Sequence, residues 1–353
     1  MKKKIFSQLY KIIREKPYDF DRSKYIRLDK NEKVIRFGKN FLNHLKKKVN
    51  SYHISSYPNI EKTYNLLAEK NHISRDSILI TAGSDLAIRY IFEIFKKKKS
   101  KVITIEPTFG MVNVYAKIFN YHNIRINFDH MLQLNVKKIF RNLKKNISFI
   151  IIANPNSPTG TIIKKKDLLK ILAQSKLLNI PVVIDEAYTE FYGFSYIKYI
   201  KKYNNLIIIR TFSKAFGLAG MRAGYLVANK KIVKILSKLK PMYEINSFAC
   251  LSIEFLLKKQ RIIDNYVKDV IRAKNFFFKK LKSIQINYLD TYANFVHVDL
   301  KNKKRIIERE LLKRKILVRK GPGVKGYDNY LRISLGSKLH MQRVFNIIKK
   351  KIN

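Results

Sequence analysis

One lysine of this chain stands where a reactive amine would be useful. Lys214 lies in the segment 210–222 (Arg-Thr-Phe-Ser-Lys-Ala-Phe-Gly-Leu-Ala-Gly-Met-Arg), directly after an apolar, β-branched run. A buried strand ending there would place the amine in the crevice of a sheet, and desolvation of an amine favours imine formation. The hydroxyls of Thr211 and Ser213 and the guanidinium of Arg222 suit a phosphate group. A lysine on an ordinary loop would not need these neighbours.

A carboxylate closes a second apolar run. Asp185 ends the segment 182–185 (Val-Val-Ile-Asp), whose composition is typical of a buried strand. Burying an ionised carboxylate costs much free energy unless it faces a cation, so Asp185 is expected to have a positive partner. A protonated pyridine nitrogen is one such cation. Tyr188, three residues later, is placed to hydrogen-bond a hydroxyl on the same ring.

A third polar group follows another apolar run. The segment 81–85 (Thr-Ala-Gly-Ser-Asp) comes after a predicted strand and opens a predicted helix. Its glycine lets the backbone approach a ligand closely, and the first-turn N–H groups of a helix form a cradle for an anion, here around Ser84 and Asp85. The alternative is a Gly-Ser turn in which Asp85 is only a helix cap, and the sequence leaves both open.

These residues lie at the ends of predicted strands. β-branched apolar runs recur at 78–81, 102–105, 149–153, 182–185, 206–211 and 224–227. Both faces of each run are apolar, and helix-length stretches with apolar spacing of three and four lie between several of them. The alternation predicts an α/β fold with a mostly parallel central sheet covered on both faces, and ligands collect at the carboxyl ends of such strands.

The pattern changes after about residue 230. Helical stretches are predicted at 232–239, 249–258, 266–281 and 303–314, and extended pieces at 294–300, 316–319 and 330–335. This α+β region predicts a smaller domain that the N-terminal segment completes. We therefore expect a large domain at 51–245, and a small domain made of 1–50 with 246–353.

The charge of the chain is strongly positive: 74 Lys and Arg against 25 Asp and Glu give +49 in 353 residues. Such a balance suits nucleic acid or an anionic membrane surface. The lysine runs are, however, scattered between apolar segments and do not alternate with stacking aromatic residues. We expect neither partner, although the positive field could speed the capture of an anionic substrate.

The remaining features predict a cytoplasmic protein without a metal site. Cys250 is the only cysteine, so an internal disulfide is impossible and a reducing compartment fits. No run of about 18 apolar residues, the length that spans a bilayer, occurs in the sequence. The seven histidines lack the spacing of metal ligands, and His297, inside an apolar strand pattern, is expected to be a core residue.

Taken together, the motifs resemble those of the class I and II aminotransferases of pyridoxal-phosphate (PLP) fold type I. Within this class the chain is most similar to the histidinol-phosphate aminotransferases and their relatives. The similarity covers nearly the whole chain in order and without large gaps. It is carried by Tyr57-Pro58, 83–85, 106–111 (Glu-Pro-Thr-Phe-Gly-Met), 154–160 (Asn-Pro-Asn-Ser-Pro-Thr-Gly), 185–188, Ser213-Lys214, Arg222 and 331–336 (Leu-Arg-Ile-Ser-Leu-Gly).

The resemblance implies a role for each matching residue at the cofactor. Lys214 would carry PLP as a Schiff base and shuttle a proton between the substrate α-carbon and the cofactor. Asp185 would pair with the pyridinium nitrogen and Tyr188 with the ring oxygen, while Phe109 would stack on the ring. The residues around the phosphate would be Ser84, Asp85, Thr211, Ser213 and Arg222.

The resemblance also implies a substrate class and a partner. Arg332 would hold an anionic group of the substrate, with Arg319 as a second anchor and Tyr243 beside them. Tyr57 would reach the phosphate from the other subunit, which implies a homodimer with shared active sites. The expected ligands are therefore PLP, an amino donor and a small anionic substrate.

Three positions depart from the usual pattern of the resembling family. Ser157 stands directly before Pro-Thr-Gly, where asparagine usually contacts the ring oxygen, and Asn156 lies beside it. The segment 31–33 (Asn-Glu-Lys) is shorter than the usual Asn-Glu-Asn-Pro. Glu244 follows Tyr243, and a carboxylate close to a phosphate-binding pocket would disfavour histidinol phosphate or recognise an extra polar group.

The sequence leaves more than one function open. The first is an aminotransferase that moves an amino group between glutamate, or a similar donor, and a small phosphorylated or otherwise anionic keto or aldehyde substrate. The second is a PLP decarboxylase of a phosphorylated amino acid, resembling the threonine-phosphate decarboxylases, because the same lysine and aspartate would serve both reactions. A non-enzymatic nucleic-acid binder that uses the positive charge is the third.

Overall fold

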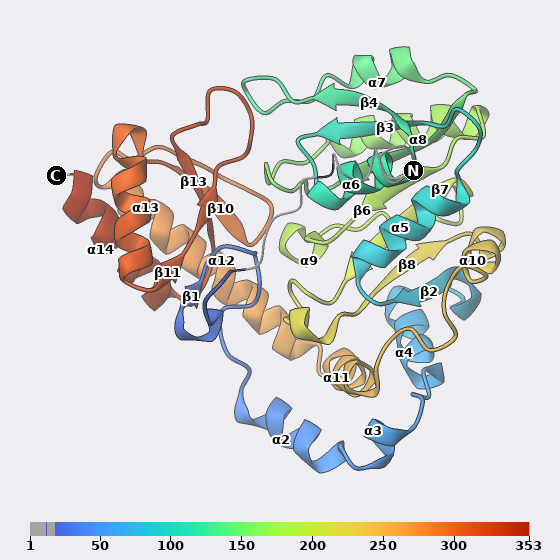
Figure 1. The fold of residues 1–353 in the computed structure, drawn as a ribbon, viewed down its shortest axis with the longest axis horizontal. Helices are drawn as coiled ribbons and strands as arrows, with labels where there is room; N and C mark the ends of the chain where they lie inside the picture. The colour runs from blue at the N-terminus through green and yellow to red at the C-terminus, as the bar shows by residue number, and fades with distance from the viewer. Residues whose placement is uncertain (1–11, 13–17, 353) are drawn as a thin grey trace, which may run out of the picture.

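The computed structural model describes residue 12 and residues 18–352. Its main body is a seven-stranded sheet in the order β2-β8-β7-β6-β5-β3-β4 (Figure 1). β8 runs antiparallel to both of its neighbours, and the other pairs are parallel. The strands are β2 (Ile78–Thr81), β3 (Lys101–Glu106), β4 (His122–Asn127), β5 (Ile147–Ala153), β6 (Val182–Asp185), β7 (Leu206–Thr211) and β8 (Gly224–Ala228).

Each face of this sheet is covered by helices because successive strand residues point to opposite faces and both sets are apolar. In β2, Ile78 and Ile80 enter one buried core, whereas Leu79 enters the other. The first core is closed by α4 (Glu61–Asn71), α7 (Val136–Asn142), α8 (Lys165–Leu177) and α11 (Ser247–Lys258). The second is closed by α5 (Ser84–Ile94), α6 (Gly110–Ile118) and α10 (Lys230–Leu236).

A separate core forms beside the large sheet, at the left of Figure 1. It lies between the four-stranded antiparallel sheet β12-β13-β10-β9 and three helices, and the N-terminal residues Leu28 and Val34 join it. Its strands are β9 (Tyr288–Leu289), β10 (Phe295–Asp299), β12 (Arg319–Lys320) and β13 (Tyr330–Ser334), and its helices are α12 (Arg261–Lys282), α13 (Lys304–Lys313) and α14 (Lys338–Ile352). A parallel pair, β1 (Ile26–Arg27) with β11 (Ile316–Leu317), ties the N-terminal segment to it.

Short elements connect these bodies. Helices α2 (Lys39–Lys48) and α3 (Tyr52–Ser55) lead from the N-terminal segment to α4 along the lower edge in Figure 1. The turn after β6 contains α9 (Thr189–Tyr192) and a 3₁₀ turn at Ile197–Tyr199. Three further 3₁₀ turns, at Arg22–Lys24, Arg75–Ser77 and Lys301–Lys303, precede β1, β2 and α13, and a fourth, Ala219–Met221, precedes β8.

The predicted α/β architecture with a mostly parallel sheet is confirmed, and the six predicted strands are present. The sequence did not indicate β4, because this edge strand is polar and mostly exposed. The helix predicted at 232–239 lies at Lys230–Leu236 instead. The extended piece predicted at 316–319 divides between β11 and β12, which belong to different sheets.

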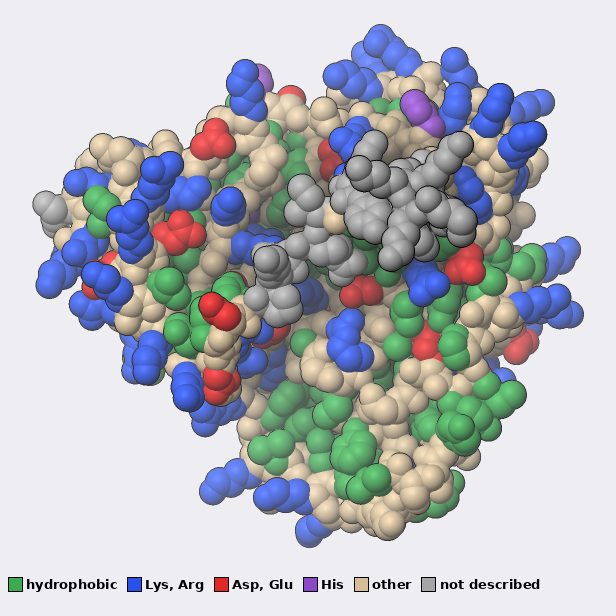
Figure 2. Space-filling view, viewed as in Figure 1, with side chains coloured by type: hydrophobic (Ala, Val, Ile, Leu, Met, Phe, Trp, Pro, Cys, Tyr) green, Lys and Arg blue, Asp and Glu red, His purple; other side chains and the backbone are tan. Residues whose placement is uncertain are grey.

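The positive charge is spread over the face of the molecule that Figure 2 shows. On the face shown in Figure 2, lysine and arginine side chains surround both bodies, with acidic side chains among them. Hydrophobic side chains gather on the lower part of this face, where Figure 1 places α3, α4 and α11. Within the described residues, no helix has the length and apolarity to cross a membrane.

Candidate active site

A pocket of about 800 Å³ lies where the carboxyl ends of the large sheet face β12 and β13. Ligands bind at this edge in open α/β sheets. Asp185 is the last residue of β6 and Thr211 the last of β7, so both strands end at the pocket. The predicted site residues in its lining are Ser84, Asp85, Phe109, Ser157, Asp185, Tyr188, Thr211, Ser213, Lys214, Arg222, Arg319 and Arg332.

Two predicted site residues do not line this pocket. Tyr57 and Tyr243 stack on each other instead, with ring centroids 4.0 Å apart and an interplanar angle of 13°. Both rings remain accessible, with Tyr57 72% exposed and Tyr243 47% exposed. The single chain thus pairs the two tyrosines with one another and leaves them outside the cavity.

Lys214 extends from the loop after β7 into the pocket. Its Nζ donates a hydrogen bond to the backbone carbonyl of Lys30 over 3.0 Å and lies 5.7 Å from the centre of the Tyr188 ring. The loop holds this position because Ala215 and Phe216 are buried and Gly217 adopts a φ of +72°, which favours glycine. A Cβ on Gly217 would also lie 2.3 Å from Cδ of Lys33, so a side chain there would require Lys33 to move.

Asp185 is buried and lacks a full counter-charge. One carboxylate oxygen, Oδ1, accepts the amide N–H of Ala187 over 3.0 Å. Burial raises the pKa of Asp185 to about 7, against the opposing effects of this hydrogen bond and of the Lys214 charge. Among the described residues, no ion pair forms with Asp185. A protonated ring nitrogen would supply the cation that this carboxylate needs, so the residue fits the pyridine end of PLP.

Tyr188 is positioned by a residue from the N-terminal segment. Asn31 donates from Nδ2 to the Tyr188 hydroxyl over 2.9 Å. Ser334 fixes Asn31 in return, because its Oγ accepts the Asn31 amide and donates to Asn31 Oδ1, each over 2.9 Å. In the sequence, Asn31 stands out only as part of a shortened motif, from which this contact could not be predicted. The carbonyl of Lys30, which accepts from Lys214, was also missed.

The opposite end of the pocket suits a phosphate group. Gly83 has a φ of +88°, and α5 begins at Ser84, so its first N–H groups face outward from the helix. Arg222 donates to Asp85 Oδ2 over 3.3 Å, and a Cβ on Gly83 would lie 2.9 Å from Arg222 Nη2. Asp85 is not a helix cap, which was the alternative left open by the sequence. Gly83 is the N-cap of α5, and no side chain caps this helix.

The segment around Ser157 presents serine, and not its asparagine neighbour, to the pocket. Asn156 is 2% exposed and donates from Nδ2 to the Pro107 carbonyl over 3.0 Å and to Thr159 Oγ1 over 2.8 Å. It therefore supports the loop. Ser157 and Phe109 line the cavity itself, so the departure from the family pattern falls on a residue that faces the ligand.

Two arginines lie side by side on adjacent strands of the small sheet, at the pocket wall. Arg319 of β12 and Arg332 of β13 are Cα partners in an antiparallel pair, and His297 of β10 is the partner of Arg332 on its other side. Burial lowers the pKa of His297 to about 3, so this ring is neutral, and its Nε2 lies 2.8 Å from the Pro158 carbonyl. Arg332 also donates to the Asp29 carbonyl over 2.8 Å.

Glu244 was expected close to the phosphate end of the pocket, and it lies behind that loop, outside the pocket lining. Its Oε1 accepts the amide N–H of Ala82 over 2.6 Å, on the loop that leads into α5. Burial raises the pKa of Glu244, while this hydrogen bond and Lys240 lower it. The carboxylate therefore supports the phosphate loop and does not line the cavity.

This fold and this site define a PLP-dependent enzyme of fold type I: one antiparallel strand in a seven-stranded sheet, a lysine after β7 and a buried aspartate at the end of β6. The aminotransferase class I and II family matches residues 23–348. The chain is 35% identical over 339 residues to the histidinol-phosphate aminotransferase of Clostridium novyi, covering 95% of this chain and 94% of that protein. It is 31% identical over 342 residues to that of Pyrococcus furiosus, with 96% of each covered.

A solved structure gives the same fold. The histidinol-phosphate aminotransferase of Sinorhizobium meliloti in complex with pyridoxal-5'-phosphate superposes with a TM-score of 0.84 at 20% identity, covering 97% of both chains. The chain belongs to the class I and II aminotransferases. It is a PLP-dependent aminotransferase.

Proposed function

We propose that this aminotransferase moves an amino group between glutamate, or a similar donor, and a small phosphorylated or otherwise anionic keto or aldehyde substrate. The name of its relatives, histidinol-phosphate aminotransferase, supports a phosphorylated substrate. The observation that carries the proposal is that Lys214 and Asp185 share one pocket with the cross-strand pair Arg319 and Arg332. The first two residues suit the cofactor and the last two suit an anionic substrate.

Bound PLP supplies an electron sink that stabilises negative charge at the substrate α-carbon. The chain's own residues bind and orient it. Lys214 would hold the cofactor covalently and would move the proton at the α-carbon, while Asp185 would keep the ring nitrogen protonated. Tyr188 and Ser157 would hydrogen-bond the ring oxygen, and Phe109 would pack on the ring. The phosphate would be held by Ser84, Asp85, Thr211, Ser213 and Arg222, partly through backbone N–H groups.

The two arginines define the substrate class. Arg319 and Arg332 are Cα partners in one pocket wall, and both line the cavity, so two guanidinium groups are available there to an anionic substrate. Arg332 is held at its Nη2 by the Asp29 carbonyl. Glutamate carries two carboxylates, and a phosphorylated acceptor would use the same cations.

The protein acts as a homodimer whose subunits share active sites. Tyr57 and Tyr243 lie on an exposed face of the molecule, and other exposed apolar side chains, Tyr52, Ile54 and Met242, are close to them in sequence. Such side chains are more favourable when covered by a partner. In the dimer, Tyr57 contacts the phosphate in the site of the partner subunit, and Tyr243 lies beside the substrate. The single cysteine fits a cytoplasmic location.

The chain divides into a large domain at 51–245 and a small domain formed by 1–50 with 246–353. The separate apolar core around α12, α13 and α14 supports this division. One segment favours a different boundary, because α11 packs on the core of the large sheet together with α4. Limited proteolysis of the PLP-loaded protein tests the boundary: cleavage near 245 supports it, and cleavage after α11 moves it to about 259.

A half-reaction screen tests the substrate proposal. PLP-loaded protein is mixed with phosphorylated amines and amino acids, among them histidinol phosphate, and with their dephosphorylated counterparts, and the absorbance of the cofactor is followed. We expect fast conversion to pyridoxamine phosphate with phosphorylated amines and slow conversion without the phosphate. Release of CO₂ without that conversion would support the decarboxylase instead. Equal rates with and without the phosphate would contradict the proposed substrate class.

A further inference from the structure

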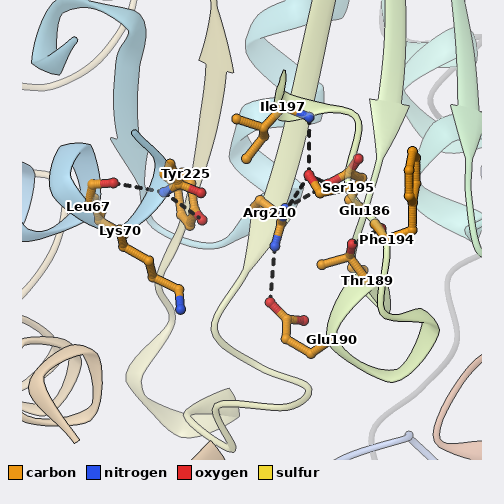
Figure 3. Close-up of polar contacts among 12 residues, drawn as sticks. Leu67, Lys70, Glu186, Thr189, Glu190, Phe194, Ser195, Ile197, Arg210 and Tyr225 are labelled. Carbon is orange, nitrogen blue, oxygen red and sulfur yellow. Dashed lines mark hydrogen bonds and ion pairs between the residues drawn. The ribbon is translucent and has the colours of Figure 1, made fainter. Parts of the chain in front are cut away.

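A buried ion cluster lies next to the pocket but outside its lining (Figure 3). It consists of Arg210, Glu186, Ser195 and Glu190. Each of the first two is the sequence neighbour of a site residue: Glu186 follows Asp185, and Arg210 precedes Thr211. The cluster and the site therefore share the ends of β6 and β7. Their side chains lie on opposite faces, because successive side chains of a strand point to opposite faces.

The contacts satisfy nearly every polar atom of the cluster. Arg210 donates from Nε to Glu186 Oε2 over 2.8 Å, from Nη2 to Ser195 Oγ over 2.8 Å and from Nη1 to Glu190 Oε1 over 3.1 Å. Ser195 donates to Glu186 Oε2 over 2.8 Å, and the Tyr196 amide donates to Glu186 Oε1 over 2.5 Å. The side chain of Glu186 is fully buried, and that of Arg210 is 10% exposed. Burial of this kind tolerates little displacement, because each displaced group would lose a partner.

The cluster joins two chain segments that carry the cofactor-facing residues. Glu186, Glu190 and Ser195 belong to the turn after β6, and Tyr188 lies inside that turn. Arg210 belongs to β7, which leads through Thr211 into Lys214. The guanidinium therefore clamps the turn that carries Tyr188 onto the strand that carries the phosphate-binding hydroxyl and the lysine.

We propose that the cluster of Arg210, Glu186, Ser195 and Glu190 positions this site: it sets where Asp185 and Tyr188 lie relative to Thr211 and Lys214, and thereby the affinity and protonation of the bound cofactor. The inference rests on the proposed roles of Asp185 and Tyr188. None of the four residues of the cluster lines the pocket. They act through their neighbours, as outer hydrogen-bond partners do in other preorganised sites.

The test compares two buried carboxylates of similar environment. Glu186→Gln removes the negative charge of residue 186 and nearly keeps the shape of its side chain. The matched control is Glu254→Gln, since Glu254 is also buried, pairs with Lys62 over 3.2 Å and accepts from Thr63 over 2.9 Å, but joins α4 to α11 away from the pocket. The dissociation constant of PLP and the pH dependence of its visible absorbance are measured for both, together with their melting temperatures.

Both variants are expected to melt at a lower temperature. Only Glu186→Gln should weaken PLP binding, by about 10-fold or more, and shift the pH midpoint of the absorbance, as loss of an outer hydrogen-bond partner does elsewhere. Ser195→Ala, which keeps the ion pair, provides a milder variant if Glu186→Gln does not fold, and a smaller change in the same direction is expected. Unchanged affinity and pH midpoint in both cluster variants would overturn the proposal.

Asp185→Ala separates this inference from the one on which it rests. If Asp185→Ala changes the PLP affinity and the pH midpoint whereas the cluster variants do not, the role of Asp185 stands and the positioning role of the cluster fails. If Asp185→Ala changes neither quantity, the proposed role of Asp185 itself fails.

Discussion

Asn31 and Tyr188 are joined by a hydrogen bond of 2.9 Å, although 157 positions separate them in the sequence. The bond holds the N-terminal segment at the pocket, which Lys30 and Asn31 both line, and the carbonyl of Lys30 accepts from Lys214. Residues of both bodies of the fold therefore hold the cofactor-facing groups. The site is completed only when the N-terminal segment and the large sheet have come together.

Replacing Asn31 with alanine should disturb the site through Tyr188. The hydroxyl of Tyr188 loses its donor, and the Ser334 hydroxyl loses the acceptor Asn31 Oδ1 while still accepting the backbone N–H of residue 31. We expect a loss of about 1–3 kcal/mol in the free energy of unfolding, because buried polar groups are left unsatisfied, together with a reduced kcat. Chemical denaturation and steady-state kinetics check this, and an unchanged kcat would show that the bond does not position Tyr188.

Lys214→Ala should abolish turnover and leave the fold intact. Lys214 makes one hydrogen bond to a backbone carbonyl and has no part in an apolar core, so its loss removes little stability. The circular-dichroism spectrum should match that of the wild type, and the visible absorbance of covalently held cofactor should be absent. Turnover within tenfold of the wild type would mean that another amine carries the cofactor.

The PLP-free protein should lose stability as the pH rises through the range in which Asp185 ionises. The folded-state pKa of this carboxyl is raised to about 7 by burial, with Asp85, Lys214 and Glu186 as its charged neighbours. The native state therefore binds more protons than the unfolded state between about pH 4 and 7, and stability falls with rising pH there. At about 1.4 kcal/mol for each unit of pKa shift, the loss reaches about 4 kcal/mol.

Denaturation of the PLP-free wild type and of Asp185→Asn at pH 5 and pH 8 isolates this contribution. The wild type should lose more stability than the variant between the two values, and PLP should reduce the difference by providing a cation. Parallel curves for the two proteins would mean that Asp185 is not the group that titrates.

Gly217→Ala tests the geometry of the lysine loop. At this position the φ of +72° and the close approach of Lys33 both disfavour a Cβ, and we expect a loss of about 1–3 kcal/mol in stability together with weaker PLP binding. Gly193→Ala, with a φ of +76° and open space, measures the backbone strain alone. Gly220→Ala, with neither feature, is the neutral control. Equal stability of all three variants would contradict the loop geometry.

Arg332→Lys should raise the KM for glutamate and should change kcat much less. Lysine keeps the charge but cannot make the bidentate contact of a guanidinium. If each arginine binds a different anion, Arg319→Lys should raise the KM for the phosphorylated substrate more than the KM for glutamate. Kinetics with each substrate separately check this, and equal effects of both variants on both substrates would contradict the division.

Part of the site followed from the sequence because its residues end buried strands. Asp185 and Thr211 close β6 and β7, and the apolar runs before them place both at the same sheet edge. The register of Arg319 with Arg332, by contrast, depends on a pairing between short strands that no local pattern indicates. β4 escaped prediction because a polar edge strand lacks the apolar signal.

Other parts depend on distant segments. The Asn31–Tyr188 bond and the carbonyl of Lys30 beside Lys214 join segments that only the folded chain brings together, so spacing could not reveal them. Glu244 was predicted near the phosphate end from its place beside Tyr243. In the folded chain it accepts the Ala82 amide instead, a contact between residues 162 positions apart that the sequence does not indicate.

A transamination that uses Lys214 and Asp185 is tested most directly by a single-turnover experiment. L-Glutamate is mixed with the PLP-loaded protein, and the cofactor absorbance and 2-oxoglutarate are followed together. We expect conversion of the cofactor to pyridoxamine phosphate, one 2-oxoglutarate for each converted site, and loss of both signals in Lys214→Ala. No conversion by glutamate or any other amino donor, with CO₂ released from a phosphorylated amino acid instead, would contradict this expectation.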